Sequence, residues 1–332
     1  MSSPSECADL VEDCILLHEP FYMEGAVGIG KSQVVAQVCK KLKMELIDER
    51  ASQMDPTDIK GFPWPDGTKM LMHWLPSSRL PPMKAKTKGL LFLDELSSAP
   101  LAVQAACYQL ILDRCVGDYI LPDGWTVGGA GNRMIDRAIT NRMSSALNNR
   151  FIHIDFETSV EDVVSYGRTV GISDDLIAFL RFRPNLLHAF DPTLNPKAFP
   201  SPRGWFKVDK VTKSNRPVAR EFNLITGIVG HGAAVEFREF MRNRLSLPTI
   251  IEIKANPDTA KLPKSAGELY AITTSMASAT TRDAYPKFLK YIERAEEEWQ
   301  IIFNRDASNV CKDLNRVPEF KAWSIAHRDV VL

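Results

Sequence analysis

Apolar and polar residues alternate in two different ways along the first half of the chain. Short, almost wholly apolar runs are typical of strands buried on both faces of a parallel sheet. Between them, apolar residues recur at helical spacing. The expected strands are 21–24, 44–47, 89–93, 125–130 and 151–156, and the expected helices are 31–42 and 101–112. This alternation predicts an α/β domain whose parallel sheet has helices on both faces.

The pattern changes after about residue 157. Helical spacing dominates there, and the expected helices are 160–169, 174–181, 203–213, 219–229 and 233–245. Segment 247–263 contains three prolines and is predicted to be a connection. Residues 264–332 are expected to be helical, with 285–304 as the strongest helix. We therefore predict an α/β core over 1–157, a helical segment over 158–255 and a C-terminal helical extension over 256–332.

The composition is that of an ordinary globular protein, with 45% apolar and 25% charged residues in a chain of 332. A length of 332 residues suggests about two domains. No run approaches the roughly 18 apolar residues of a membrane-spanning helix. The first residues carry neither the basic nor the apolar region of a secretion signal. We expect a cytoplasmic protein that does not engage a membrane.

Charge and cysteine spacing make several functional classes less probable. The formal net charge is zero, whereas dedicated nucleic-acid binders usually carry a basic excess. The six cysteines form no Cys-x-x-Cys pair, and the six histidines form no His-Glu-x-x-His cluster. Reduced thiols are therefore expected, and neither a metal cluster nor a redox motif is predicted.

One segment, Gly25–Ser32, fits the phosphate-binding pattern G-x-x-x-x-G-K-[ST]. Glycines let the backbone turn so that successive N–H groups point at one anion, and the helix that follows adds its positive end. The lysine reaches the β- and γ-phosphates, and the serine hydroxyl ligates Mg²⁺. ATP and Mg²⁺ are the predicted cofactors. The contacting residues are Gly25, Ala26, Val27, Gly28, Ile29, Gly30, Lys31 and Ser32.

Two acidic residues, Asp94 and Glu95, directly follow the apolar run 89–93. Acids in this position lie at the carboxyl end of a parallel strand, where open α/β sheets bind their ligands. Together with the phosphate-binding loop, the pair predicts that Asp94 holds Mg²⁺ beside Ser32. Glu95 is predicted to be the general base that polarises the attacking water.

These elements, with Gly131-Asn132 after the next strand and Asn149-Arg150-Phe151 before the last, resemble an AAA+ ATPase. More narrowly, the chain resembles the MoxR group, including its CbbQ/NorQ-like and phage-encoded members. The resemblance covers about residues 15–215. The segments that carry the narrower likeness are Met54–Gly61, Val103–Ala106 and Ser201–Arg203.

The resemblance implies a P-loop NTPase (AAA+) fold in which an α-helical lid and further C-terminal helices follow the sheet. It makes Asn132 the sensor 1 amide that orients the lytic water. Arg150 would be the arginine finger supplied to the neighbouring subunit, with Arg142 as the second candidate. Arg203 would be sensor 2, touching the γ-phosphate from the lid.

The same resemblance implies a hexameric ring that remodels or activates a client protein, in the manner of a chaperone. A partner with a von Willebrand factor A domain would deliver the client. Two alternatives stay open. The first is an ATPase that acts on nucleic acid, either as a motor or in association with a nuclease. The second is a switch that binds ATP but scarcely hydrolyses it. A metabolic kinase is disfavoured because no acceptor site is evident. The short segment before the first strand leaves recognition of adenine uncertain.

Two short hairpins are expected outside the sheet, over 62–74 with an Asp-Gly turn and over 114–121. In related rings such inserts contact the substrate or partner. Trp64, Trp74 and Tyr119 are the aromatic residues for such contacts, although packing within the hairpins is the commoner role. The lysines of 84–88 are expected to lie in a solvated loop rather than on phosphates.

Overall fold

The protein is described by a computed structural model covering residues 2–69, 71–133, 143–194, 196–214, 216–244 and 246–327. The chain divides into two compact units. The first comprises Met1–Asp162 and Phe190–Pro196, and the second comprises Val163–Ala189 and Lys197–Leu332.

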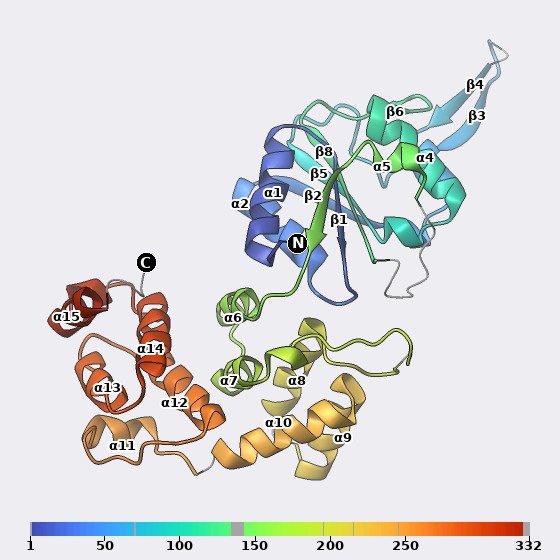
Figure 1. Ribbon diagram of the computed structural model, residues 1–332. Coiled ribbons are helices and arrows are strands. Elements are labelled where there is room, and N and C mark those ends of the chain that lie inside the picture. Colours follow the sequence, from blue (N-terminus) through green and yellow to red (C-terminus); the bar gives the residue numbers. More distant parts are fainter. Residues whose placement is uncertain are drawn as a thin grey trace. The chain divides into compact units, whose positions relative to one another are not determined.

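The first unit is built on a five-stranded parallel sheet (Figure 1) with the strand order β2-β5-β8-β1-β9. This arrangement, with a phosphate-binding loop after β1 and helices following the sheet, confirms the predicted fold class. The strands are β1 (Phe21–Gly25), β2 (Glu45–Arg50), β5 (Gly89–Asp94), β8 (Trp125–Gly131) and β9 (Ile152–Phe156).

Alternate side chains of the central strands enter two separate cores, one on each face of the sheet. Phe21 and Met23 of β1 pack with α1 (Pro4–Leu16) and α2 (Lys31–Leu42). Tyr22, between them, points to the opposite face and packs with α4 (Leu101–Asp113). Figure 1 shows these helices on opposite sides of the sheet. Burial on both faces explains why β1 and β5 read as continuous apolar runs.

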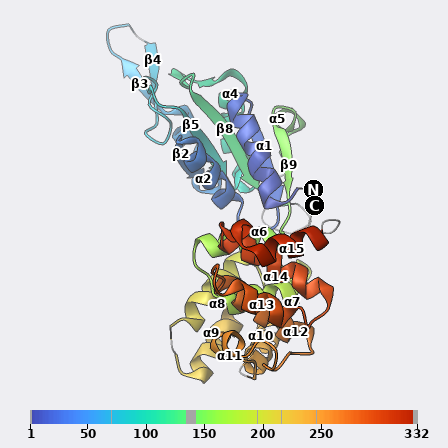
Figure 2. The same ribbon diagram turned by 90° about the vertical axis from the view of Figure 1, so that its left-hand side faces the viewer.

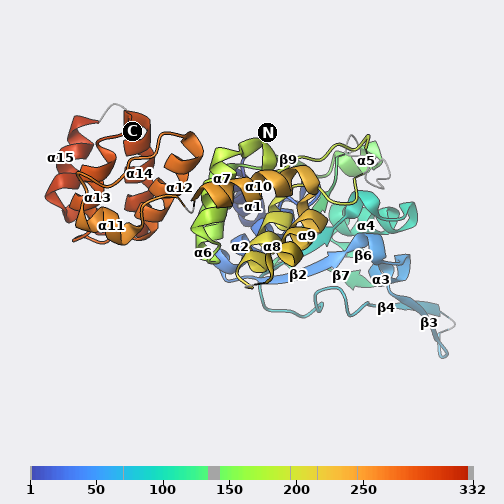
Figure 3. The same cartoon turned by 90° about the horizontal axis from the view of Figure 1, so that it is seen from below.

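Both predicted hairpins are present. The first pairs β3 (Phe62–Asp66) with β4 (Leu71–Leu75), and the second pairs β6 (Cys115–Val116) with β7 (Tyr119–Ile120). They are joined where the Trp74 N–H donates to Asp118 Oδ2 at 2.7 Å. The β3–β4 hairpin projects from its unit in two perpendicular views (Figure 2, Figure 3). The first unit also contains α3 (Pro56–Lys60) and α5 (Ser145–Asn148).

The described part of the second unit is helical and has two centres of packing. Around α7, the Phe179 ring lies 5.1–5.5 Å from the rings of Trp205, Phe237 and Phe240, and the rings of Trp205 and Phe237 are 5.7 Å apart. A second core joins α11 to α15. The helices are α6 (Val160–Thr169, which begins in the first unit), α7 (Asp174–Phe182), α8 (Pro202–Thr212), α9 (Val218–Val229), α10 (His231–Arg244), α11 (Ile250–Ala255), α12 (Ala266–Ser278), α13 (Tyr285–Ile292), α14 (Glu297–Val310) and α15 (Pro318–Ala326).

A buried ion-pair cluster ties α14 to α6 and α7. Asp306 of α14 is 1% exposed and accepts hydrogen bonds from Arg181 of α7. Arg168 of α6 lies 3.0 Å from the same carboxylate. Because a buried carboxylate needs charged partners, this cluster holds the C-terminal helices against the first helices of the unit.

Two predictions for the second unit, the connection over 247–263 and the single helix over 285–304, differ from the structure. The proline-containing segment 247–263 holds a helix, α11, because Thr249 and Glu252 close a capping box at its start. The helix predicted over 285–304 is two helices, α13 and α14. At the break, Arg294 donates to the carbonyl oxygens of Pro257 and Ala260, both at 2.9 Å, and these contacts favour a corner over a continuous helix.

No helix within the described ranges is long and apolar enough to cross a membrane.

Candidate nucleotide-binding site

The loop between β1 and α2 has the backbone of a phosphate-binding turn. Gly28 has a φ of 78° and Gly30 a φ of 101°, values at which a side chain would be strained. Gly30 is also the N-cap of α2, so the positive end of a 12-residue helix opens directly onto the loop. The sequence folds locally in this way because only glycine takes both turns at little cost.

Lys31 is the first residue of α2 and is 8% exposed. Its Nζ donates to the carbonyl oxygens of Gly25 at 2.8 Å and Ala26 at 2.9 Å, and to Asn132 Oδ1 at 3.1 Å. A buried ammonium must be paired, and here the loop and Asn132 provide the acceptors. A phosphate entering the loop would offer Lys31 stronger, charged acceptors.

Ser32 and Asp94 face each other across the site. The Ser32 hydroxyl donates to Asp94 Oδ2 at 2.7 Å, and Asp94 Oδ1 accepts the Glu95 backbone N–H at 2.8 Å. Hydroxyl and carboxylate oxygens are the ligands that Mg²⁺ prefers. The two residues therefore match the pair predicted to hold the metal.

Glu95 follows Asp94 with a left-handed backbone, φ 58° and ψ 29°. Its carboxylate accepts a hydrogen bond from the hydroxyl of Ser52. Ser52 lies just beyond β2, whose residue Arg50 is paired with Asp94 in the sheet. Ser52 thus reaches Glu95 because the carboxyl ends of adjacent parallel strands share one edge.

Asn132 directly follows β8, which lies between β5 and β1. Register places Leu93 opposite Gly129 and Glu24 opposite Gly131. Asn132 is therefore flanked by the acidic pair on one side and the phosphate-binding loop on the other. Its bond to Lys31 places one amide between the predicted general base and the predicted phosphate ligand.

Arg150 occupies a different part of the first unit. Its guanidinium lies 3.9 Å from the centre of the Tyr108 ring on α4, and it donates to the Ala146 carbonyl of α5. These described contacts involve neither Lys31 nor Asp94 nor Glu95. A tyrosine face fixes the direction of a guanidinium while leaving it charged.

The two remaining predicted arginines stand apart from this cluster. Arg203 is exposed in the first turn of α8, after the N-cap Ser201, and belongs to the second unit. Its role toward phosphate stays a prediction. Arg142, the second candidate for an arginine finger, lies outside the described residues.

Two acidic residues beside the site, Asp48 and Glu24, have raised pKa values. Burial raises the pKa of Asp48, and the charge of Asp94 raises it further. Burial, followed by the charge of Asp155, raises the pKa of Glu24, the residue before the loop. Both pKa shifts come first from burial, and a neighbouring carboxylate adds to each.

The residues present fit a magnesium–nucleotide. A loop with left-handed glycines at a helix start accepts phosphate, and a lysine is held within it. A serine hydroxyl and a carboxylate lie 2.7 Å apart beside it as metal ligands. Lys31 would hold the phosphates, and Ser32 and Asp94 would hold Mg²⁺.

The fold is that of a P-loop NTPase. A scan against protein-family models gives no match, and a search of curated proteins finds no relative. Among solved structures, the chain is similar to NtrX from Brucella abortus in complex with ATP, with 14% identity and a TM-score of 0.43. The match covers 98% of this chain and 67% of that chain.

The chain is also similar to a mutant of RuvB from Thermotoga maritima, with 16% identity and a TM-score of 0.40. That match covers 87% of this chain and 85% of the RuvB chain. Likeness at these TM-scores supports no conclusion about this chain, whose chemistry is inferred from its own residues.

Two neighbours of the predicted residues were not predicted from the sequence, Ser52 and Tyr108. Each contacts its partner across a gap of more than 40 positions, since the numbers of Ser52 and Glu95 differ by 43 and those of Tyr108 and Arg150 by 42. A correct guess of the strand order would have placed Ser52 near Glu95. No sequence signal points to Tyr108, because α4 carries apolar residues all round.

Proposed function

We propose that this protein is a Mg²⁺-dependent ATPase that works as one subunit of an AAA+ ring. The observation that carries the proposal is a pair of hydrogen bonds from neighbouring residues, Lys31 to Asn132 and Ser32 to Asp94, with Glu95 adjacent to Asp94. A site that merely binds nucleotide needs Lys31, Ser32 and Asp94. A general base and a water-orienting amide beside them are the additional groups that hydrolysis requires.

The chemistry assigned to the residues is simple. Lys31 exchanges the carbonyl oxygens of its own loop for the β- and γ-phosphates. Ser32 and Asp94 would hold Mg²⁺, which would supply positive charge beside the phosphates. Glu95 takes the proton of a water that Asn132 orients. That water's oxygen bonds to the γ-phosphorus as the bond to the β–γ bridging oxygen breaks, leaving ADP and phosphate.

Arg150 supports an oligomer because its described contacts lie away from the residues of its own site. Held on the face of Tyr108, its guanidinium would serve the γ-phosphate of a neighbouring subunit. A cation supplied in this way increases the rate by roughly 10³–10⁵. The proposed assembly is a homo-oligomeric ring, with a hexamer expected from the resemblance to AAA+ proteins.

We further propose a MoxR-like role, in which the cytoplasmic ring remodels a client delivered by a von Willebrand factor A domain partner. The β3–β4 hairpin supports a protein-contacting role. Phe62, Trp64, Leu71 and Leu75 are 48–60% exposed, and the register places them on one face of the hairpin. Exposed apolar patches of this kind are typical of interaction sites.

The backbone edges of this hairpin are poorly suited to adding a strand. Pro63 and Pro65 have no N–H on β3, and the N–H of Trp74 opposite Pro63 is already bonded to Asp118. A client would therefore contact the apolar side chains rather than pair with the backbone.

The test of the proposed function is ATP turnover measured against protein concentration, with particle size measured in parallel. Wild type would be compared with Glu95→Gln and Arg150→Ala, and with Arg220→Ala, an exposed arginine of α9, as a matched control. The specific activity of wild type should rise with protein concentration. The ATP turnover of both site variants should fall at least about 100-fold, and that of the control should match wild type.

Mixing the two inactive variants separates a shared site from two independent defects. Partial recovery on mixing would show that Glu95 and Arg150 act on one nucleotide from different subunits. Turnover that is independent of concentration and of Arg150 would reject the ring. Stimulation by DNA that disappears steeply with salt would favour the nucleic-acid alternative.

A further inference from the structure

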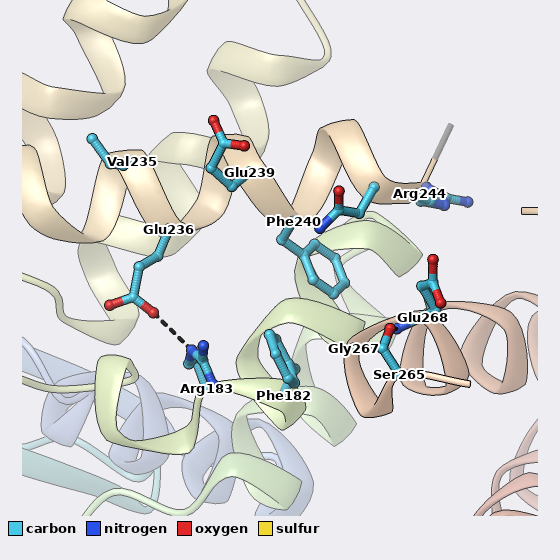
Figure 4. A pocket seen from close by; sticks show the side chains of 12 residues that line it. Phe182, Arg183, Val235, Glu236, Glu239, Phe240, Arg244, Ser265, Gly267 and Glu268 are labelled. Carbon is cyan, nitrogen blue, oxygen red and sulfur yellow. Dashed lines mark hydrogen bonds and ion pairs between the residues drawn. The ribbon is translucent and has the colours of Figure 1, made fainter. Parts of the chain in front are cut away.

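A cavity of about 310 Å³ lies within the second unit, between the end of α7, the helix α10 and the start of α12 (Figure 4). Phe182 and Phe240 form its floor, with their rings 5.8 Å apart and nearly parallel. A Cβ on Gly267 would lie 3.2 Å from the Phe182 ring, so the glycine lets α12 approach closely. The floor is therefore an aromatic surface of fixed geometry.

Most charged residues at the mouth of the cavity form ion pairs with one another or with residues nearby. Arg183 donates to Glu236 at 2.7 Å (Figure 4) and covers the Phe182 ring at 4.2 Å. Glu239 is paired with Arg242, one turn away on α10, at 3.2 Å. Arg244 is paired with Asp175 and donates to Ser275 at 3.2 Å. Within each of these pairs the charges cancel.

Glu268 is the exception among these charged residues. It stands three residues after the N-cap Ser265, a position at which glutamate usually returns to the N-cap backbone. Glu6 in α1 and Glu252 in α11 do so, at 2.8 and 2.7 Å. Glu268 lines the cavity instead, and among the described residues no cation lies within ion-pair distance of its carboxylate. The cavity therefore has, in the first turn of α12, one carboxylate without an ion-pair partner among the described residues.

We propose that this cavity binds a segment of a partner protein that presents an aromatic side chain next to a lysine or arginine. The aromatic ring would lie on Phe240 and against the edge of the Phe182 ring, whose face Arg183 covers, and the cation would pair with Glu268. The volume is at the lower limit for small-molecule sites, roughly 300 Å³, and suits one anchoring side chain. The inference concerns a site separate from the nucleotide site and does not depend on ATP hydrolysis.

The test uses short peptides with the full-length protein and no nucleotide. The probes are N-acetyl-phenylalanyl-lysine amide, its glutamate analogue with glutamate in place of lysine, and its alanine analogue with alanine in place of phenylalanine. Ligand-observed saturation-transfer NMR gives their relative affinities. The lysine peptide should bind roughly fivefold more tightly than the glutamate analogue, as expected for one exposed ion pair, and the alanine analogue should bind least.

Two variants and one control locate the binding. Glu268→Gln should bring the ratio of the affinities for the lysine and glutamate peptides close to one. Glu298→Gln, which changes an exposed glutamate in the first turn of a helix in the same unit, should leave the preference unchanged. Phe182→Ala should abolish binding of the phenylalanine peptides, with a thermal melt by circular dichroism to confirm that the variant folds.

Several results would overturn the proposal. They are no detectable binding of the lysine peptide to wild type, equal affinity for the lysine and glutamate peptides, or a preference that survives Glu268→Gln. Tighter binding of phenethylamine than of the lysine peptide would also overturn it, because the cavity would then be a small-molecule site.

Discussion

At the scale of single residues, Glu95 is distinguished by its left-handed backbone and by its side-chain hydrogen bond with Ser52. A left-handed conformation costs a residue other than glycine about 1 kcal/mol or more, and here it turns the chain just after β5. The Ser52 hydroxyl then holds the carboxylate. A general base works best when its orientation is fixed before the reaction begins.

We predict that Ser52→Ala lowers kcat roughly three- to tenfold and leaves nucleotide affinity unchanged, because Glu95 loses the contact that orients it. Ser98→Ala is the matched control, since Ser98 is close to Glu95 in the chain and its hydroxyl has no described hydrogen bond. Steady-state ATPase assays and nucleotide titration measure the two quantities. A rise in kcat would instead mean that Ser52 restrains Glu95.

The cysteines provide a second prediction at this scale. Burial raises the pKa of Cys39 to about 11 and that of Cys107 to about 12. At pH 8 these thiols are almost wholly protonated, and only the thiolate reacts. Cys115 and Cys311 are partly exposed. Iodoacetamide should therefore label Cys115 and Cys311 at least about tenfold faster than it labels Cys39 and Cys107. Timed mass spectrometry of the native protein measures this, and early labelling of Cys107 would contradict it.

At the scale of elements, the β3–β4 hairpin combines an anchored residue with exposed ones. A Cβ on Gly117 would lie 3.1 Å from Trp74, so Trp74 rests on the second hairpin. Trp64 belongs to the exposed face and is 56% exposed. A two-stranded hairpin is only marginally stable by itself, so this contact is what holds it in place.

We therefore predict opposite outcomes for the two tryptophans. Trp64→Ala should change the free energy of unfolding by less than about 0.5 kcal/mol. Trp74→Ala should cost about 1–2 kcal/mol, since a half-buried ring is lost. Denaturant titration gives both values. If Trp64→Ala were the more damaging variant, the exposed face would have a structural role and would not be free for a client.

At the scale of the whole molecule, the two units have separate cores, and we expect each to unfold in its own thermal transition. The proposed nucleotide-binding residues belong to the first unit, and the Asp306 cluster lies within the second. Removing the Asp306 carboxylate leaves the Arg168 and Arg181 charges buried without it, which typically costs about 3–5 kcal/mol.

Calorimetry should accordingly show two transitions. Magnesium–ADP at about 100 times its Kd should stabilise only one of them, by about 2.7 kcal/mol, and EDTA should reduce this gain. Asp306→Asn should lower the midpoint temperature of only the other transition, the one that the nucleotide does not stabilise. Arg305 also approaches Asp306, at 3.7 Å, so Arg305→Gln is a milder companion variant. A single transition that moves with both changes would show that the two units unfold as one.

The sequence by itself determined the features that depend on neighbours along the chain. The phosphate-binding loop, the apolar strand before Asp94 and Glu95, and the two hairpins each lie within about a dozen residues, where glycine conformation and apolar spacing decide the structure. The α/β class followed because buried parallel strands and amphipathic helices leave different patterns. The start of α11 was missed although its capping box is also local, because the prolines around it outweighed that signal.

The tertiary structure decided what depends on residues far apart in the chain. The strand order brought Ser52 to Glu95 and Asn132 to Lys31, and helix packing put Tyr108 under Arg150. The break between α13 and α14 comes from contacts of Arg294 with a distant loop. Glu268 reads as a cap in the sequence, and only the packing of α7 and α10 beside it turns that carboxylate into the wall of a cavity. In each case the deciding energy is a contact between segments, which no local pattern encodes.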